Sequence, residues 1–367
     1  MINDGIKNIY AKPVTFPIYQ TSSYIVPEGE KYRYTREYNP TVENLGKEIM
    51  HIEGSEDYNV FSSGMGAITT TLLALASPGD RILTHLDTFA RSYHFIKDFM
   101  GKWGIKTDIS IPGTENIISS IRKDTKIVFI ESVTNPILRV NDIKAISERC
   151  REVDALLIVD STVPTPYNIK SIKLGADIVI HSSSKFIAGH NTVISGLAAG
   201  RKDLMEKIDA MRRTLGTTLD PNSAFLTETG MKTLDLRMEK INSNALKIAG
   251  ELMNNPGIKR VIYPGLPGHP DHDTAAKYMK GYSGVVCFEI NGDVHKFTEN
   301  LKMIIPANTM GGVESIISTP KTMSHRSLTD DELRILHVND NFIRLSTGIE
   351  SPDEILGDIN NALSYSQ

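Results

Sequence analysis

Cysteine is scarce in this chain: Cys150 and Cys287 are the only two among 367 residues. They lie far apart and match no metal-ligand spacing, so a disulfide framework and a cysteine-based zinc site are both excluded. Positive charge is not in excess either, because the formal net charge is -4. Nucleic acid and an anionic membrane surface are therefore not expected as main partners.

Long apolar runs are also absent. The N-terminal segment MINDGIKNIYAKPVTF has no apolar core of a secretory signal, and no run elsewhere approaches the length of a membrane span. We expect a cytoplasmic protein that does not enter a membrane, and two free cysteines fit a reducing compartment. With 40% hydrophobic and 23% charged residues, the chain has an ordinary globular composition and is long enough to bury a sizeable core.

Short apolar runs alternate with helical stretches over the first 235 residues. Helices are predicted over 67–76 and 142–153. This alternation indicates βαβ units and a mostly parallel sheet, whose buried strands are continuously apolar. The predicted strands are 58–61, 81–84, 127–130, 156–159 and 178–180.

The pattern changes after about residue 235, where a long helix over 240–254 and a strand over 284–290 are predicted. We therefore predict an α/β protein with a large, mostly parallel domain and a smaller C-terminal α+β domain. The predicted limits are an N-terminal arm at 1–38, a large domain at 39–237 and a C-terminal domain at 238–367.

Ligands of open α/β sheets bind beyond the carboxyl ends of the strands, so the residues that follow each strand are the first candidates for a site. The strand at 58–61 is followed by SSGMG, which opens a helix. Glycines let the backbone approach a phosphate at a helix N-terminus. The segment is neither a P-loop nor a GxGxxG motif, and taken alone it is better explained as a plain structural turn.

Two further strands also end in polar residues. Asn135 stands before Pro136 and either aims an amide at a ligand oxygen or simply forms the turn. Asp160 ends the strand at 156–159, and its carboxylate either faces a cationic ring nitrogen or caps the next segment.

The strand at 178–180 is followed by His-Ser-Ser-Ser-Lys, ending at Lys185. A single lysine on a loop is usually solvated. Here the serine hydroxyls suit a phosphate, and a desolvated amine suits an adduct with a carbonyl group. Arg344 lies within a short apolar strand, where it forms either a structural ion pair or a clamp on a substrate carboxylate.

One cofactor accounts for the four strand ends together. Pyridoxal phosphate needs an amine for its aldehyde, a carboxylate for its ring nitrogen, donors for its phosphate and a donor for its phenolic oxygen. In this interpretation Lys185 carries the cofactor and, once displaced by the substrate amine, moves protons between Cα and Cγ.

The sequence resembles the Cys/Met-metabolism family of pyridoxal-phosphate enzymes, which includes cystathionine γ-synthase, cystathionine γ-lyase, cystathionine β-lyase, methionine γ-lyase and O-acetylhomoserine sulfhydrylase. The resemblance covers about residues 15–355. It implies the aspartate-aminotransferase-like fold, called fold type I, in a homotetramer built from active homodimers. The segments that carry it are YTREYNPT, SSGMGAI, ESVTNP, VDSTVPTPYN, HSSSKFIAGH, GGVESII and IRLSTGIE.

The resemblance also implies roles for single residues. Lys185 looks like the Schiff-base lysine and Asp160 like the partner of the ring nitrogen. Asn135 matches the residue that meets the phenolic oxygen, and it also borders the substrate. The remaining matches are Gly64, Met65, Ser182 and Ser184 for the phosphate, Tyr34 and Arg36 for the phosphate of the neighbouring subunit, and Thr309 and Arg344 for the substrate carboxylate, with Thr309 replacing the usual serine.

The chain departs from the family pattern near the reacting atoms. Phe89 stands in place of the cofactor-stacking tyrosine, so it can stack but has no hydroxyl to pass a proton to the leaving group. Tyr93 and Tyr34 are the substitutes that we consider. Arg91 replaces the cysteine that is characteristic of methionine γ-lyases, and Asn308 replaces a glutamate of several members that handle cystathionine.

We therefore expect a transsulfuration enzyme of the cystathionine γ-synthase or γ-lyase type, which performs γ-replacement or γ-elimination on a small amino acid. The alternatives are an O-acetylhomoserine sulfhydrylase or a methionine γ-lyase-like C–S lyase. A catalytically silent homologue is a further possibility, and it predicts the loss of cofactor-binding residues.

Overall fold

The computed structural model describes residues 13–25, 29 and 31–366, and its larger sheet has seven strands in the order β1-β7-β6-β5-β4-β2-β3. Strands β2 to β6 run parallel, whereas β7 is antiparallel to both β6 and β1. The predicted mostly parallel sheet is thus confirmed. Its strands are β1 (Asp57–Phe61), β2 (Arg81–His85), β3 (Lys106–Ser110), β4 (Thr125–Glu131), β5 (Leu156–Asp160), β6 (Ile178–His181) and β7 (Gly196–Gly200).

Both faces of this sheet are covered by helices, which explains why its central strands are continuously apolar. Along β4, Ile127 and Phe129 belong to the hydrophobic cluster on one face, while Val128 and Ile130 belong to the cluster on the other. The helices of the described residues are α1 (Pro40–Glu53), α2 (Gly64–Leu75), α3 (Ala90–His94), α4 (Thr114–Ser120), α5 (Ile143–Glu152), α6 (Thr165–Asn168), α7 (Lys202–Leu215), α8 (Pro221–Met231), α9 (Leu234–Met253), α10 (His272–Tyr278), α11 (Val294–Glu299), α12 (Asp330–Ile335) and α13 (Pro352–Ser366).

The predicted helices are present, and two of them begin earlier than predicted. The helix predicted from residue 67 begins at Gly64, so the glycine segment forms the first turn of α2 and not a separate turn before it. The Ser63 side chain caps this helix by accepting from the backbone N–H of Gly66 at 2.9 Å. The helix predicted from residue 240 begins at Leu234.

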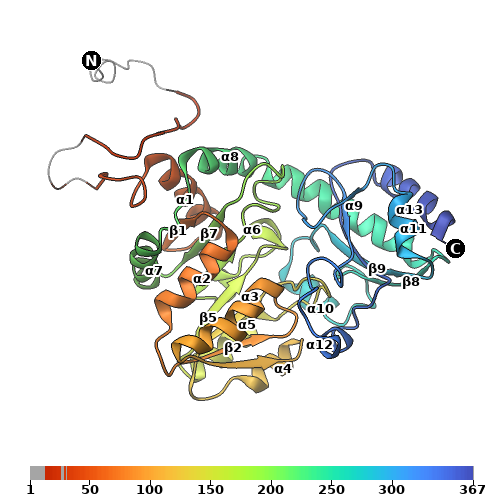
Figure 1. Ribbon diagram of the computed structural model, residues 1–367, viewed down its shortest axis with the longest axis horizontal. Coiled ribbons are helices and arrows are strands. Elements are labelled where there is room, and N and C mark those ends of the chain that lie inside the picture. The colour runs from red at the N-terminus through yellow and green to blue at the C-terminus, as the bar shows by residue number, and fades with distance from the viewer. Residues whose placement is uncertain (1–12, 26–28, 30, 367) are drawn as a thin grey trace.

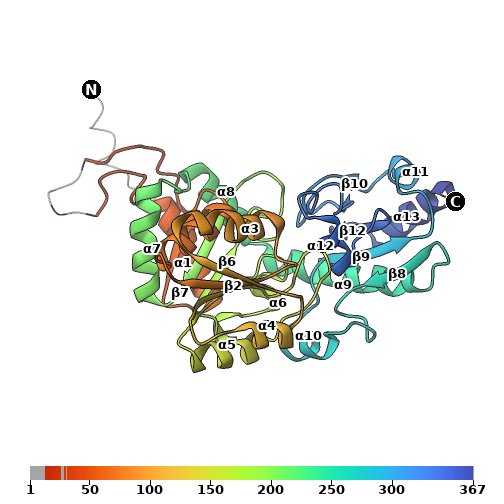
Figure 2. The same ribbon diagram turned by 60° about the horizontal axis from the view of Figure 1, so that its bottom comes forward.

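The second sheet has the order β10-β11-β12-β9-β8 and is antiparallel except for the pair β10–β11. Helices α9, α11 and α13 contribute to its hydrophobic cluster, and Figures 1 and 2 show this unit beside the larger sheet. Its strands are β8 (Ile258–Ile262), β9 (Val285–Ile290), β10 (Ile305–Pro306), β11 (Ile316–Ser318) and β12 (Phe342–Ser346).

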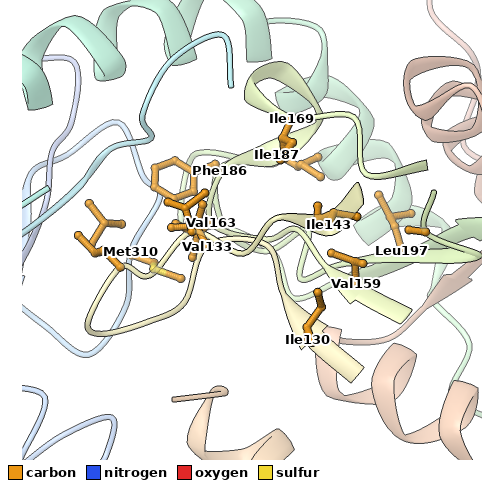
Figure 3. Close-up of a cluster of buried hydrophobic side chains, with 14 of the residues drawn as sticks. Ile130, Val133, Ile143, Val159, Val163, Ile169, Phe186, Ile187, Leu197 and Met310 are labelled. Carbon is orange, nitrogen blue, oxygen red and sulfur yellow. The ribbon is translucent and has the colours of Figure 1, made fainter. Parts of the chain in front are cut away.

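Helix α9 joins the two units. Its first turns place Leu234 and Met238 in the large core, and its last turns place Ile248 and Leu252 against the smaller sheet. The predicted boundary between residues 237 and 238 lies inside this helix, and the domain limits stay a prediction. The large core also reaches the C-terminal unit, because Met310 lies near Phe186 at one end of the cluster (Figure 3).

The carboxyl ends of β4, β5 and β6 lie at one edge of the larger sheet. The register places Glu131 opposite Asp160 and Asp160 opposite Ile180. Strand β1 runs in the same direction as β6, because each is antiparallel to β7. The polar residues that follow these four strands therefore meet at this edge.

Among the residues that the structure describes, none of the helices has the length and apolar character needed to span a membrane. No group of His, Cys, Asp or Glu side chains in the same residues could hold a metal ion.

Candidate active site

A cavity of about 560 Å³ lies at the carboxyl edge of the larger sheet and is bordered by both units. It brings together residues that are up to 281 positions apart, from Ser63, which caps α2, to Arg344 in β12. Of the residues predicted for the site, the following line it: Gly64, Met65, Phe89, Asn135, Asp160, Ser182, Ser184, Lys185, Thr309 and Arg344.

Tyr34 and Arg36 do not line this cavity. Both lie in the N-terminal arm, which extends away from the larger sheet (Figure 1). The Arg36 guanidinium lies 5.5 Å from the centre of the Tyr34 ring, and its Nη1 donates to the backbone oxygen of Arg213 at 2.7 Å. In the single chain they therefore cannot contribute to a ligand in this cavity.

One end of the cavity is a backbone cradle at the start of α2. A Cβ atom on Gly64 would lie 2.6 Å from Cβ of Ser182 and 2.9 Å from its Cα, so only glycine permits this approach. The first backbone N–H groups of a twelve-residue helix point here, and they carry partial positive charge. The Ser184 hydroxyl accepts from the backbone N–H of Ser195 at 2.8 Å and donates to its carbonyl oxygen at 3.1 Å, which fixes that side of the cradle.

Two carboxyl groups stand side by side on neighbouring strands. Asp160 is 8% exposed and accepts from the backbone N–H of Thr162 at 2.9 Å, so it does cap the next segment. Burial raises the pKa of Asp160. Burial and then the charge of Asp160 raise the pKa of Glu131 well above its usual range. A cation bound against Asp160 would favour its ionised form.

Glu131 holds two of the predicted site residues in place. Its Oε1 accepts from the backbone N–H of Phe89 at 2.7 Å, and its Oε2 accepts from the backbone N–H of Asn135 at 3.2 Å. Both carboxylate oxygens are therefore occupied within the protein. Glu131 positions the loops on either side of the cavity and was not predicted as a site residue.

The Lys185 amine lies beside the loop of the C-terminal unit that carries Thr309. Its Nζ donates to Oγ1 of Thr309 at 3.0 Å. Burial and then the positive charge of Arg344 lower the pKa of Lys185. A larger share of this amine is therefore neutral at neutral pH than in a solvated lysine, and a neutral amine is the nucleophilic form.

Arg344 is buried but lacks a carboxylate partner among the described residues. Its Nη1 donates to Oδ1 of Asn135 at 2.9 Å and its Nη2 to the backbone oxygen of Thr309 at 3.0 Å, while Nε has no partner in that part of the chain. Burial lowers its pKa. Arg237 is also buried, but its guanidinium donates to three backbone carbonyls and to a threonine hydroxyl. Arg237 is thus structural, whereas Arg344 is left to bind an anion.

A model of the Cys/Met metabolism PLP-dependent enzyme family matches residues 1–364. The chain belongs to this family. Cystathionine gamma-synthase 1, chloroplastic, of Arabidopsis thaliana is 38% identical over 375 residues, which are 97% of this chain and 66% of that protein. Cystathionine beta-lyase of Lactococcus lactis subsp. cremoris (strain MG1363) is 37% identical over 357 residues, which are 95% of this chain and 94% of that protein.

The same family is represented among solved structures. Cystathionine gamma-lyase from Lactobacillus plantarum, complexed with L-serine, matches with a TM-score of 0.93 at 32% identity and covers 96% of this chain and 93% of its own. The predicted fold type I is therefore confirmed. The relatives are named for different reactions, so they support transsulfuration chemistry dependent on pyridoxal phosphate and leave the particular reaction open.

The residues of the cavity fit the cofactor of this family. The cradle at Gly64 suits its phosphate, Asp160 offers a buried carboxyl group to its ring nitrogen, and Lys185 offers an amine of lowered pKa. Phe89 lines the cavity where a ring could stack on it. Pyridoxal phosphate supplies an aldehyde that condenses with amines and a ring that withdraws electrons from the substrate Cα.

The cradle gives a first testable prediction. Gly64→Ala is expected to weaken cofactor affinity about tenfold, because the added Cβ forces apart the two segments that would hold the phosphate. Titration of the apoprotein with pyridoxal phosphate, followed by fluorescence, measures this. Gly250→Ala is the matched control, since a Cβ there meets nothing within 4 Å. Equal affinity of Gly64→Ala and the unsubstituted protein would place the phosphate elsewhere.

The structure argues against one predicted proton donor. Tyr93 is buried and outside the cavity lining, and its hydroxyl donates to Oε1 of Glu332 at 2.7 Å. Burial and the hydrogen bond to Glu332 raise the pKa of Tyr93 to about 12. Tyr93 therefore cannot replace the hydroxyl that Phe89 lacks. The sequence could not reveal this, because the partner lies 239 residues further along the chain.

Proposed function

We propose that the protein is a pyridoxal-phosphate enzyme of the cystathionine γ-synthase or γ-lyase type, which replaces or eliminates the γ-substituent of an amino acid. The observation that carries the proposal is the Thr309 bridge. Thr309 accepts from the Lys185 amine through its side chain and from Arg344 through its backbone. The group that would move protons is thereby held beside the group that would bind the substrate carboxylate.

In this proposal each residue has one task. Arg344 binds the substrate carboxylate through two N–H groups, with Asn135 and Thr309 setting its orientation. Asp160 keeps the ring nitrogen protonated. Lys185 would hold the cofactor through its aldehyde and, as a free amine, would take up the protons lost from Cα and Cβ and return protons to the substrate chain. Its lowered pKa suits a base near neutral pH.

A panel of substrates tests the proposal. Release of 2-oxobutyrate from cystathionine supports the γ-lyase, and formation of cystathionine from an O-acylhomoserine and cysteine supports the γ-synthase. Turnover of O-acetylhomoserine with sulfide alone, or of methionine alone, supports the sulfhydrylase or C–S lyase alternatives. A protein that shows no visible absorption with added cofactor and converts none of these would contradict the proposal and favour a silent homologue.

Phe89 sets the second prediction. Phe89→Tyr places a hydroxyl at the cavity wall and is expected to raise the turnover of γ-elimination about tenfold or more, because general acid catalysis of the leaving group becomes available. Steady-state release of 2-oxobutyrate measures the change. Phe89→Leu is the control, as it removes the ring without adding an acid. Unchanged turnover in Phe89→Tyr would show that another group already protonates the leaving group.

We further propose a homodimer as the active unit, within a homotetramer, and a cytoplasmic location. The support is the position of Tyr34 and Arg36, which match the family pattern for phosphate contacts yet do not line the cavity of their own chain. If a partner's arm supplies them, Arg36→Ala should weaken cofactor binding in a protein that sediments as a dimer or larger. A fully active monomer would contradict this assignment.

A further inference from the structure

Strands β2 and β4 separate before they reach the carboxyl edge of the larger sheet. Their backbone pairing ends at Leu83 and Val128, although β2 continues to His85 and β4 to Glu131. The chain passes from β2 to β3 on one side of this gap and from β4 to β5 on the other, so the gap is the switch point of the sheet. Ligands of open α/β sheets bind in the crevice at such a point. The contacts across this gap therefore set the walls of the crevice.

The side chain of His85 bridges the gap. His85 is fully buried, and its Nε2 lies 3.1 Å from the backbone nitrogen of Glu131. The next residue of β4, Ser132, donates its backbone N–H to the carbonyl oxygen of Asp160 in β5 at 2.9 Å. Successive N–H groups of a strand point to opposite sides, so the N–H of Glu131 faces β2. The histidine ring thus takes the place of the missing strand partner.

The hydrogen bonds of His85 determine which ring nitrogen carries the proton. A backbone N–H can only donate, so Nε2 accepts from Glu131 and carries no proton. The proton of the neutral ring is therefore on Nδ1, which donates to Oδ1 of Asp87 at 2.7 Å and lies 3.2 Å from Oγ1 of Thr88. Asp87 is buried as well, and the backbone N–H of Thr88 donates to the carbonyl oxygen of His85 at 3.2 Å. The ring joins the turn that follows β2 to the end of β4.

Glu131 is the fixed partner in this contact. Its backbone oxygen accepts from Nδ2 of Asn141 at 2.8 Å, and β5 pairs with it on the other side. The turn after β2 ends at Phe89, which precedes the five-residue helix α3 and has no side-chain cap. The backbone N–H of Phe89 donates to the Glu131 carboxylate at 2.7 Å. Two hydrogen bonds to Glu131, one at each end of residues 85–89, therefore tie this turn to β4.

We propose that His85 is a positioning residue that places the ring of Phe89 against the cofactor. His85 and Asp87 do not line the cavity, whereas Phe89 does, so the histidine acts only through the turn. The inference rests on the proposed function, because it takes Phe89 as the residue that stacks on the cofactor. A stacked ring needs a set separation from its partner, and a shift of the turn weakens that contact without removing the side chain.

Two substitutions separate the contacts of the histidine ring. His85→Gln keeps an acceptor near the position of Nε2, whereas His85→Asn keeps a donor near Nδ1 but is too short to reach Glu131. We expect His85→Asn to weaken cofactor affinity about tenfold and to alter the visible circular dichroism per bound cofactor, because the turn is released from β4. His85→Gln should stay within about threefold of the unsubstituted protein. Fluorescence titration of the apoprotein and spectra of the holoprotein measure these effects.

A double-mutant cycle shows whether His85 acts through Phe89. In a Phe89→Leu protein the stacking ring is gone, so the addition of His85→Asn should change cofactor affinity by less than about twofold. His269→Gln is the matched control. His269 is also buried, and its Nδ1 accepts from the backbone N–H of Asp271 at 3.1 Å, outside the cavity lining. The visible dichroism of this control should be unchanged, whatever the change in its melting temperature.

Three results would overturn the inference: unchanged affinity and dichroism in His85→Asn, an equal further loss in the Phe89→Leu protein, or the same change of dichroism in His269→Gln. If His85→Asn does not fold, His85→Met is measured in its place, because methionine fills the volume of the ring without a strong acceptor. These measurements need no turnover. A holoprotein that converts none of the amino acids in the panel would therefore overturn the proposed function and leave the role of His85 standing. A protein that takes up no cofactor would overturn both.

Discussion

Lys185→Ala is expected to abolish the visible absorption of the bound cofactor and to lower kcat about 1,000-fold or more. The loss combines two roles, because the same amine would hold the cofactor covalently and move protons between Cα and Cγ. Absorption spectra of the reconstituted protein and stopped assays with the preferred substrate measure the two effects. Reduction of the holoprotein with borohydride should label the peptide that contains Lys185 and no other.

Lys170→Ala is the matched control for this experiment. Lys170 is also partly buried, and burial lowers its pKa, but it lies outside the cavity and its amine donates to the backbone oxygen of Ile52 at 2.7 Å. If a lowered pKa alone were enough for a lysine amine to bind the cofactor, both variants would lose cofactor. We expect the Lys170 variant to keep the absorption band. Labelling of Lys170, or a coloured Lys185→Ala protein, would contradict the assignment.

The strand ends of the larger sheet could be predicted from the sequence because one physical rule applies to all of them. A strand buried on both faces is continuously apolar, so the runs at β4, β5 and β6 are visible without any structure. Parallel strands also share a carboxyl edge, which brings Asn135, Asp160 and Lys185 together. The same rule could have singled out Glu131, which ends β4 opposite Asp160.

The start of α2 shows where local preference misleads. Glycines at positions 64 and 66 disfavour a helix interior, so the sequence indicates a turn. In the structure the Ser63 cap and the close approach to Ser182 outweigh that preference, and the helix begins at Gly64. A phosphate in the proposed cradle would therefore meet helix N–H groups and not only loop N–H groups.

Residues supplied by the C-terminal unit could not be predicted from local pattern. Thr309 entered through family resemblance alone. Arg344 was visible as an arginine within a short apolar strand, but no periodicity marks the place of either residue at the cavity. Contacts between residues more than 200 positions apart are decided by packing of the two units, which a reading of short segments cannot supply.

Arg344→Met is expected to lower kcat/KM for the amino-acid substrate about 30-fold to 5,000-fold, equivalent to about 2–5 kcal/mol, with most of the loss in KM. The reason is that the clamp on the substrate carboxylate disappears. The fold should persist, because the guanidinium has no carboxylate partner among the described residues and methionine fills a similar volume. Steady-state kinetics and thermal unfolding measure both effects.

The same variant should alter the pH dependence of cofactor uptake. Uptake requires the neutral form of the Lys185 amine. The fraction of the amine in this form grows as the pH rises through the pKa of Lys185. The charge of Arg344 lowers that pKa in addition to burial, so its removal raises the pKa and moves the uptake profile to higher pH. Arg344→Lys retains the charge and should keep the profile near that of the unsubstituted protein, while still losing the two-point clamp. A profile that does not move in Arg344→Met, together with an unchanged KM, would show that Arg344 neither binds the substrate nor tunes the lysine.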